Sequence, residues 1–184
     1  ISSDPSFLSN KDWNSGGNDG WNLAAKSGTW DINLADTART RIDFDPPTLN
    51  DGQWHHVGFV VHRENPGVVN DSIFIWTDNQ VTPYLLFADD FIPGSELGPV
   101  GNRDNYALCF GQDGTENYSA KFPGSLDEVR IWHAALTPET LKEWRHKPVT
   151  AAHPNFSSLV GYWNFDEVVD GAYPCLLYTS DAAD

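Results

Sequence analysis

The alternation of apolar and polar residues along the chain predicts a series of short β-strands. It is clearest in residues 51–63, where β-branched and aromatic side chains alternate on both faces of the predicted strand. One face carries Val57, Phe59 and Val61, and the other carries Trp54, Gly58 and Val60. Apolar residues on both faces are typical of a strand that is covered on both sides. We therefore predict a central strand here, with the ring of Trp54 in the core.

The same pattern predicts further antiparallel strands on either side of this one. They span residues 6–12, 21–25, 28–34, 39–44, 72–77, 81–87, 106–111, 123–132 and 159–165. Residues that favour turns separate them, among them the glycines of 14–20 and the prolines of 45–47. Asp78 and Asn79 fill a two-residue position between two strands, which predicts a tight hairpin.

One segment, residues 136–146, has the signals of a helix instead. Thr137 suits the N-cap position and Pro138 the first helical position, because proline has no N–H to leave unpaired there. Leu136 and Leu141 occupy the two positions of a hydrophobic staple. The sequence therefore predicts an all-β, antiparallel domain with one short helix near its C-terminus.

Composition and charge narrow the classes of partner. The 184 residues suffice for one sandwich-type domain, and the formal net charge is −15. Such a charge, without basic patches, repels nucleic acid and anionic membranes, so we expect neither as a partner, and it favours cations and neutral ligands. No apolar stretch is long enough to span a membrane, so we expect no membrane insertion. Since the chain starts at Ile1 and has no signal peptide, we interpret it as part of a longer, multidomain chain.

Five blocks of sequence follow one another in a fixed order. They are Asp-Gly-Gln-Trp-His-His-Val within 50–61, Ile-Trp-Thr-Asp-Asn at 75–79, Gly-Ser-Leu-Asp-Glu-Val-Arg-Ile-Trp at 124–132, Ala-Leu-Thr-Pro-Glu at 135–139, and Leu-Val-Gly-Tyr-Trp-Asn-Phe-Asp-Glu at 159–167. Together they resemble the laminin-G-like and pentraxin-like jelly rolls, relatives of the concanavalin A-type lectins and glucanases. The resemblance implies an antiparallel β-sandwich of jelly-roll type over residues 1–172, lacking the first strands of the family.

The tail, residues 173–184, shows no period and is excluded from this domain. It resembles the translated adapter sequence that ends some metagenomic reading frames, so we interpret it as unstructured or artefactual. Cys175 lies in this tail and Cys109 in an apolar strand. Two separate thiols are therefore favoured over a disulfide.

Calcium is the metal that the resemblance suggests. Pentraxins place Gln, Glu and Asp ligands after the strand that corresponds to residues 106–111. Here Gln112 and Asp113 follow that strand, and Asp104 and Glu116 are close in sequence. Calcium prefers carboxylate and carbonyl oxygens, so these four are candidate metal ligands. The alternative for these four residues is a solvated acidic loop that binds no metal. The loop 12–19 is a second candidate site for calcium.

Three tryptophans lie near predicted loops and are candidates for binding a sugar. They are Trp13, Trp21 and Trp30, with Asn18 and Asp19 beside them. An exposed ring and nearby amide or carboxylate groups are what a carbohydrate site uses. The alternative is that these rings belong to the core, as we expect for Trp54, Trp132 and Trp163.

The sequence shows no set of residues for catalysis. Asp127 and Glu128 are adjacent, so in a strand they point to opposite faces and cannot flank one glycosidic bond. We expect Asp127 to accept loop amides and Glu128 to pair with Arg130. A nucleophile elbow and a phosphate loop are also absent from the sequence. We therefore predict that the chain is not an enzyme.

The sequence thus predicts a non-catalytic extracellular recognition module, secreted or on a cell surface. Its partner would be a glycan or an extracellular protein, and calcium would stabilise it. Two alternatives stay open. The chain could be a structural accessory domain of a secreted phosphoesterase- or glycosidase-type hydrolase, with no ligand of its own, or a degenerate glycoside hydrolase.

Overall fold

The computed structural model describes residues 4–26, 29–39, 41–44, 49–62, 72–78, 80–85, 100–101 and 104–170. The chain divides into two compact units, Ile1–Gly124 and Ser125–Asp184, and each is described by itself. The tail 173–184, for which we predict no structure, lies outside the described residues, and so does Cys175. Cys109 is a buried, free thiol, and burial raises its pKa, so it keeps its proton.

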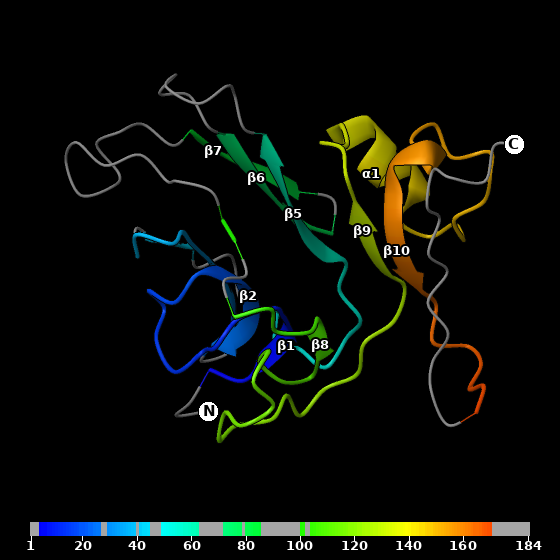
Figure 1. Cartoon of the computed structure of the whole chain (residues 1–184). Coiled ribbons are helices and arrows are strands. Elements are labelled where there is room, and N and C mark those ends of the chain that lie inside the picture. Colours follow the sequence, from blue (N-terminus) through cyan, green and yellow to red (C-terminus); the bar gives the residue numbers. More distant parts are fainter. Residues whose placement is uncertain are drawn as a thin grey trace, which may run out of the picture. The chain divides into compact units, whose positions relative to one another are not determined.

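Strands dominate the described part of the first unit (Figure 1). They are β1 (Ser6–Ser9), β2 (Gly20–Lys26), β3 (Thr29–Ala35), β4 (Arg41–Phe44), β5 (Val57–His62), β6 (Ser72–Thr77), β7 (Gln80–Leu85) and β8 (Cys109–Phe110). A five-stranded sheet has the order β4-β3-β2-β1-β8, and a three-stranded sheet has the order β5-β6-β7. Every described pairing is antiparallel. The predicted all-β, antiparallel character is therefore confirmed.

A β-bulge in β1 gives the five-stranded sheet two different faces. Ser6 lies opposite Ala24, but Leu8 lies opposite Leu23, so β1 has one extra residue between these pairs. In a regular strand, residues three positions apart point to opposite faces. Because of the extra residue, Ser6 and Ser9 point to the same face. One face therefore receives small and polar side chains, and the other receives apolar ones.

The apolar face supplies most of the core of the first unit. Leu23, Trp30, Ile32 and Leu34 are all buried, because they alternate along β2 and β3 on this face. Trp21 lies on the same face, and its ring meets that of Phe59 in β5 edge-on at 6.2 Å between centroids. The two sheets contact each other at this pair of rings.

Strand β5 is shorter than the alternation predicts, which changes the position of Trp54. The backbone turns at Asp51, whose carboxylate accepts the N–H of Gln53 at 2.9 Å, and Gly52 has a φ of 77°. The ladder with β6 begins only at Val57. Trp54 lies in the preceding loop with 69% of its surface exposed, so the prediction that it is a core residue was wrong.

The hairpin between β6 and β7 forms as predicted. Thr77 lies opposite Gln80, which leaves a two-residue connection. Asp78 has a φ of 53°, the left-handed conformation that Asp and Asn tolerate in such turns. The turn of the hairpin is fastened to the residue directly before β5, because Asp78 N–H donates to the carbonyl of His56 at 2.7 Å.

The second unit is built from β9 (Val129–Trp132), α1 (Pro138–Trp144), a short 3₁₀ helix η1 (Phe156–Ser158) and β10 (Leu159–Trp163). Strands β9 and β10 pair antiparallel. The buried core consists of Val149, Leu159 and Tyr162, with Trp132 and Phe156 packed against it. The predicted core residues Trp132 and Trp163 are half-buried.

Helix α1 begins where the sequence places it. The side chain of Thr137 accepts the N–H of Thr140 at 3.3 Å, and Pro138 is the first helical residue. No helix in the described residues is long and apolar enough to cross a membrane.

Removing this cap should weaken the second unit measurably. We expect Thr137→Ala to lower its free energy of unfolding by about 1 kcal/mol, because the N–H of Thr140 loses its partner. Thr137→Ser keeps an acceptor at the same position and should cost less than half as much. Urea denaturation followed by circular dichroism would measure both, and equal losses in the two variants would contradict the cap.

Candidate functional site

The polar face of the five-stranded sheet is closed rather than open to a ligand. Ser9, Asn22 and Asn33 lie opposite one another on β1, β2 and β3, and all three are fully buried. Ser6 also belongs to this face, and its hydroxyl lies 2.5 Å from the side-chain oxygen of Asn22. Buried polar groups of this kind need partners inside the protein.

Lys11 supplies a cation to this face. Its side chain is fully buried, and its ammonium donates to Oδ1 of Asn33 at 2.5 Å and to the carbonyl of Gly16 at 2.9 Å. Asn33 in turn donates to the carboxylate of Asp43 at 2.7 Å. Lys11 therefore joins the loop 10–19 to the sheet, which the sequence did not reveal. A buried ammonium must have such acceptors, because desolvating an unpaired charge is very costly.

The residues predicted to bind a sugar do not form one open site. Trp30 has only 3% of its surface exposed, so it is a core residue and cannot offer its ring to a ligand. Trp21 packs on Phe59. Trp13 is half-buried, donates its indole N–H to the carbonyl of Asp4, and has the Lys11 ammonium 5.7 Å from its ring centroid.

The two polar residues of this predicted site belong to the loop itself. Asn18 donates from its side chain to the carbonyl of Asp12 at 3.1 Å. Asp19 is 6% exposed and thus buried. The Asn18 side chain is therefore engaged within the loop 10–19, and the Asp19 side chain is shielded from solvent.

Two of the four predicted calcium ligands are buried and hydrogen-bonded within the protein. Asp113 is fully buried, and its carboxylate already accepts the N–H of Trp13 at 3.0 Å and the hydroxyl of Thr115. Gln112 is buried as well, and it accepts the N–H of Asp113 and donates to the carbonyl of Tyr118. Calcium needs six to eight oxygens that are free to bind it. These two side chains have their polar atoms engaged by the protein.

The remaining candidates do not complete a metal site. Asp104 and Glu116 are both exposed. Within the described part of the chain, no group of three or more His, Cys, Asp and Glu side chains could hold a metal ion. The calcium site stays a prediction that the geometry of these residues does not favour.

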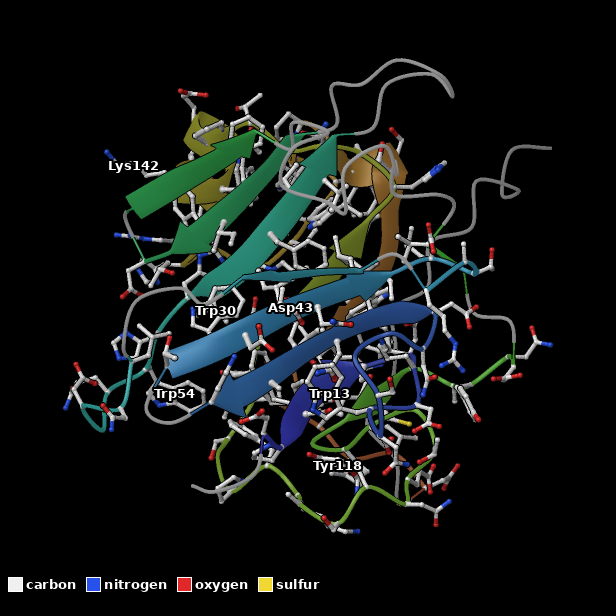
Figure 2. All side chains as sticks on the ribbon, turned by 90° about the vertical axis from the view of Figure 1, so that its left-hand side faces the viewer. Trp13, Trp30, Asp43, Trp54, Tyr118 and Lys142 are labelled. Carbon is white, nitrogen blue, oxygen red and sulfur yellow. The ribbon has the colours of Figure 1, made fainter. Side chains whose placement is uncertain are left out.

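The exposed Trp54 (Figure 2) directly precedes His55, which makes ionic contacts to two carboxylates. His55 contacts a different carboxylate with each ring nitrogen: Nδ1 is 2.9 Å from Asp78 and Nε2 is 2.8 Å from Asp51. Asp78 also accepts the N–H of His56 at 2.9 Å. We call Asp51, His55 and Asp78 the carboxylate–histidine clamp. The clamp fastens the loop that bears Trp54 to the turn between β6 and β7.

The clamp changes the proton affinity of its members. Hydrogen bonds to Asp78 and then to Asp51 raise the pKa of His55, although partial burial acts against them. The hydrogen bond from His55 lowers the pKa of Asp51. Burial by itself would raise the pKa of Asp78, but the hydrogen bonds from His55 and from the His56 amide outweigh it and lower that pKa. The clamp is thus arranged for a charged imidazolium between two carboxylates.

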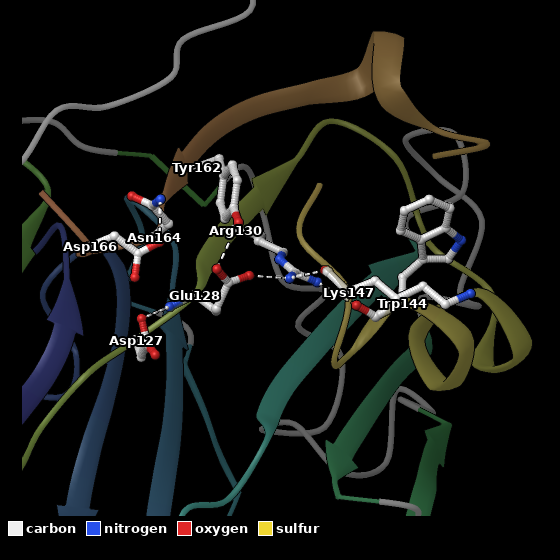
Figure 3. Close-up of polar contacts among 8 residues, drawn as sticks. All are labelled: Asp127, Glu128, Arg130, Trp144, Lys147, Tyr162, Asn164 and Asp166. Carbon is white, nitrogen blue, oxygen red and sulfur yellow. Dashed lines mark hydrogen bonds and ion pairs between the residues drawn. The ribbon is translucent and has the colours of Figure 1, made fainter. Parts of the chain in front are cut away.

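The acidic pair Asp127 and Glu128 has a structural role in the second unit (Figure 3). Glu128 pairs with Arg130, as predicted, and accepts the hydroxyl of Tyr162 at 2.7 Å. Burial, followed by the bond to Glu128, raises the pKa of Tyr162 to about 12, so its hydroxyl stays a donor. Asp127 accepts the N–H of Glu128, in line with the expectation that it satisfies a loop amide.

Arg130 connects this pair to the end of helix α1. Its guanidinium donates to the carbonyl of Trp144 at 2.8 Å and to that of Lys147 at 2.7 Å (Figure 3). These carbonyls belong to the last helical residue and the turn after it, where partners inside the helix are missing. The cluster therefore holds α1 to β9.

Trp54 is the exposed aromatic residue that the strand pattern led us to assign to the core. A signal was present, because Asn50-Asp51-Gly52 favours a turn directly before it. The clamp had no such signal, since Asp78 is 23 residues from His55. Comparisons of the chain with protein-family models, with curated proteins and with solved structures each found no match.

Proposed function

We propose that this chain is a non-catalytic, extracellular recognition module of the laminin-G-like jelly-roll type, and that it binds neutral carbohydrate through Trp54. The observation that carries the proposal is the 69% exposure of this ring. A large, flat ring exposed to solvent offers apolar area on which a partner can stack, and two ionic contacts hold the loop that carries it. The ordered sequence blocks support the jelly-roll part of the proposal.

The chemistry around Trp54 favours an uncharged sugar. A pyranose with equatorial hydroxyls has a flat C–H face that can stack on an indole ring, while its hydroxyls meet polar groups at the side. Asp51 and Asp78 keep side-chain exposures of 59% and 44%, so they can accept hydrogen bonds from such hydroxyls. The net charge of −15 opposes uronic acids and sialic acids. Calcium has no part in this proposal.

Replacing Trp54 should separate binding from stability. We expect Trp54→Ala to weaken binding of cellohexaose, a neutral glucan oligosaccharide, by about 30-fold or more, the usual loss when a central tryptophan is truncated. Its free energy of unfolding should change by less than about 0.5 kcal/mol, because the ring contributes little to the core. Isothermal titration calorimetry and urea denaturation would measure these two effects.

A matched control is Val168→Ala, which removes another exposed apolar side chain, 59% exposed, in the second unit. It should leave cellohexaose binding unchanged. A glycan array of neutral and acidic sugars would show whether a different neutral sugar binds better. If neither neutral nor acidic glycans bind, or if Trp54→Ala binds as well as the original chain, the structural accessory domain becomes the better assignment.

A further inference from the structure

We propose that the carboxylate–histidine clamp is a proton-controlled device that fixes the loop bearing Trp54, so that carbohydrate binds more tightly in mildly acidic than in alkaline solution. The binding half of this inference rests on the proposed function above. The half that concerns the loop does not, because it follows from the contacts of His55 alone.

The geometry of the clamp requires two donors on one imidazole ring. Both ring nitrogens of His55 lie within 2.9 Å of a carboxylate oxygen. A neutral imidazole has a single N–H, so it can donate to only one of these two oxygens. The other nitrogen would then point its lone pair at a carboxylate. Only the protonated ring donates to Asp51 and Asp78 at the same time.

Few other charges face the ring. Its described ionic neighbours are Asp51 on the same loop and Asp78 on the turn between β6 and β7. His56 follows in sequence and acts on the charge of Asp78, and its own ring lies edge-on to Trp76 at 6.0 Å between centroids. Both near charges are negative, so they favour the protonated form of His55 together.

The sign of the effect follows from the direction of the shift. The pKa of His55 is raised above the ordinary value of 6.5 in the folded chain. Its stabilising effect is therefore fully present below about pH 6.5 and is lost as the pH rises through the folded-state pKa. Below about pH 6.5 His55 donates to both carboxylates. Above its folded-state pKa it can donate to only one of them.

The two arms of the clamp respond differently to loss of the proton. The arm to Asp78 is supported by backbone contacts that do not titrate, since Asp78 N–H donates to the carbonyl of His56 and His56 N–H donates to Asp78. Asp51 is more exposed, and its described contacts are to Gln53 and His55. We therefore infer that deprotonation releases the Asp51 side, which includes Trp54, and leaves the hairpin in place.

The test uses the whole chain with 5-fluorotryptophan and reads the ¹⁹F NMR signal of Trp54, which is assigned by its loss in Trp54→Phe. Between pH 5.5 and 9 we expect this signal to shift along a single titration curve with a midpoint above 6.5. The curve should be absent in His55→Gln. Asp51→Asn, a milder change that removes the negative charge of one arm but keeps an acceptor oxygen, should lower the midpoint. The control His133→Gln, at an exposed histidine of the second unit, should leave the curve unchanged.

Binding of cellohexaose at pH 6 and pH 8.5 tests the second half. We expect it to weaken by roughly two- to fivefold at the higher pH, the range for one partly exposed ion pair, and to be independent of pH in His55→Gln. A Trp54 signal that does not titrate, or that titrates equally in His55→Gln, would overturn the clamp. A titrating signal without any binding would overturn the proposed function and the binding half, and would support the clamp itself.

Discussion

Replacing Trp30 with alanine should lower the free energy of unfolding of the first unit by about 3–5 kcal/mol, the usual range for truncating a buried large aromatic residue. Trp30 is 3% exposed, and its ring packs on that of Phe7 at 6.4 Å between centroids. Alanine would leave a cavity beside the ring of Phe7, on the apolar face of the sheet. Urea denaturation followed by circular dichroism would give the difference.

Two other variants make this result specific. Trp30→Phe keeps most of the ring and removes an indole N–H that is buried without a hydrogen-bond partner, so it should cost about 1 kcal/mol or less. Trp54→Ala removes the same side chain from an exposed position and should have almost no effect on unfolding. A loss below about 1 kcal/mol for Trp30→Ala would mean that the face of the sheet which carries it is not part of the core.

The second large effect concerns Lys11. We expect Lys11→Met to lower the free energy of unfolding by about 2–4 kcal/mol, because the buried Oδ1 of Asn33 and the half-buried carbonyl of Gly16 lose their donor, at about 1–3 kcal/mol for each orphaned buried group and less for a half-buried one. Methionine fills a similar volume, so the loss would report the missing ammonium and not a cavity. Denaturation curves and amide exchange within the loop 10–19 would measure it.

The matched control is Lys121→Met, which makes the same chemical change at an exposed position of the same unit. It should alter stability by no more than about 0.5 kcal/mol. If both variants lose the same amount, the effect comes from net charge, and the ammonium of Lys11 has no special role in the loop.

Local signals predicted the elements whose structure depends on neighbouring residues. The cap of α1 needs only Thr137 and Pro138, and the hairpin after β6 needs only two turn residues, so both could be predicted from a few letters. The alternation of Trp30, Ile32 and Leu34 was also visible, but we kept Trp30 as a candidate for sugar binding because it lies near a predicted loop. The periodicity was a better guide to its burial than its distance from a turn.

The errors and omissions concern contacts between distant residues. The pairing of Lys11 with Asn33 spans 22 positions, and that of Asp113 with Trp13 spans 100. Lys11 lies beside an aspartate in a polar segment, which is typical of a solvated loop. Asp113 follows a strand, where the resemblance places a metal ligand. Which donor reaches each side chain is decided by the order of the strands, and the sequence pattern does not contain that order.

The position of β1 between β2 and β8 also has a consequence for how the chain folds. Ser9 pairs with Asn22 on one side and with Cys109 on the other. The backbone groups on the β2 side of β1 can therefore form hydrogen bonds early, whereas those on the β8 side must wait for a strand about a hundred residues further along the chain. Contacts of such long sequence separation slow folding, since the entropy of closing a large loop must be lost before they form. During synthesis, the first strand therefore keeps an open hydrogen-bonding edge until residue 110 has emerged, and this edge is where a second nascent chain could pair with it.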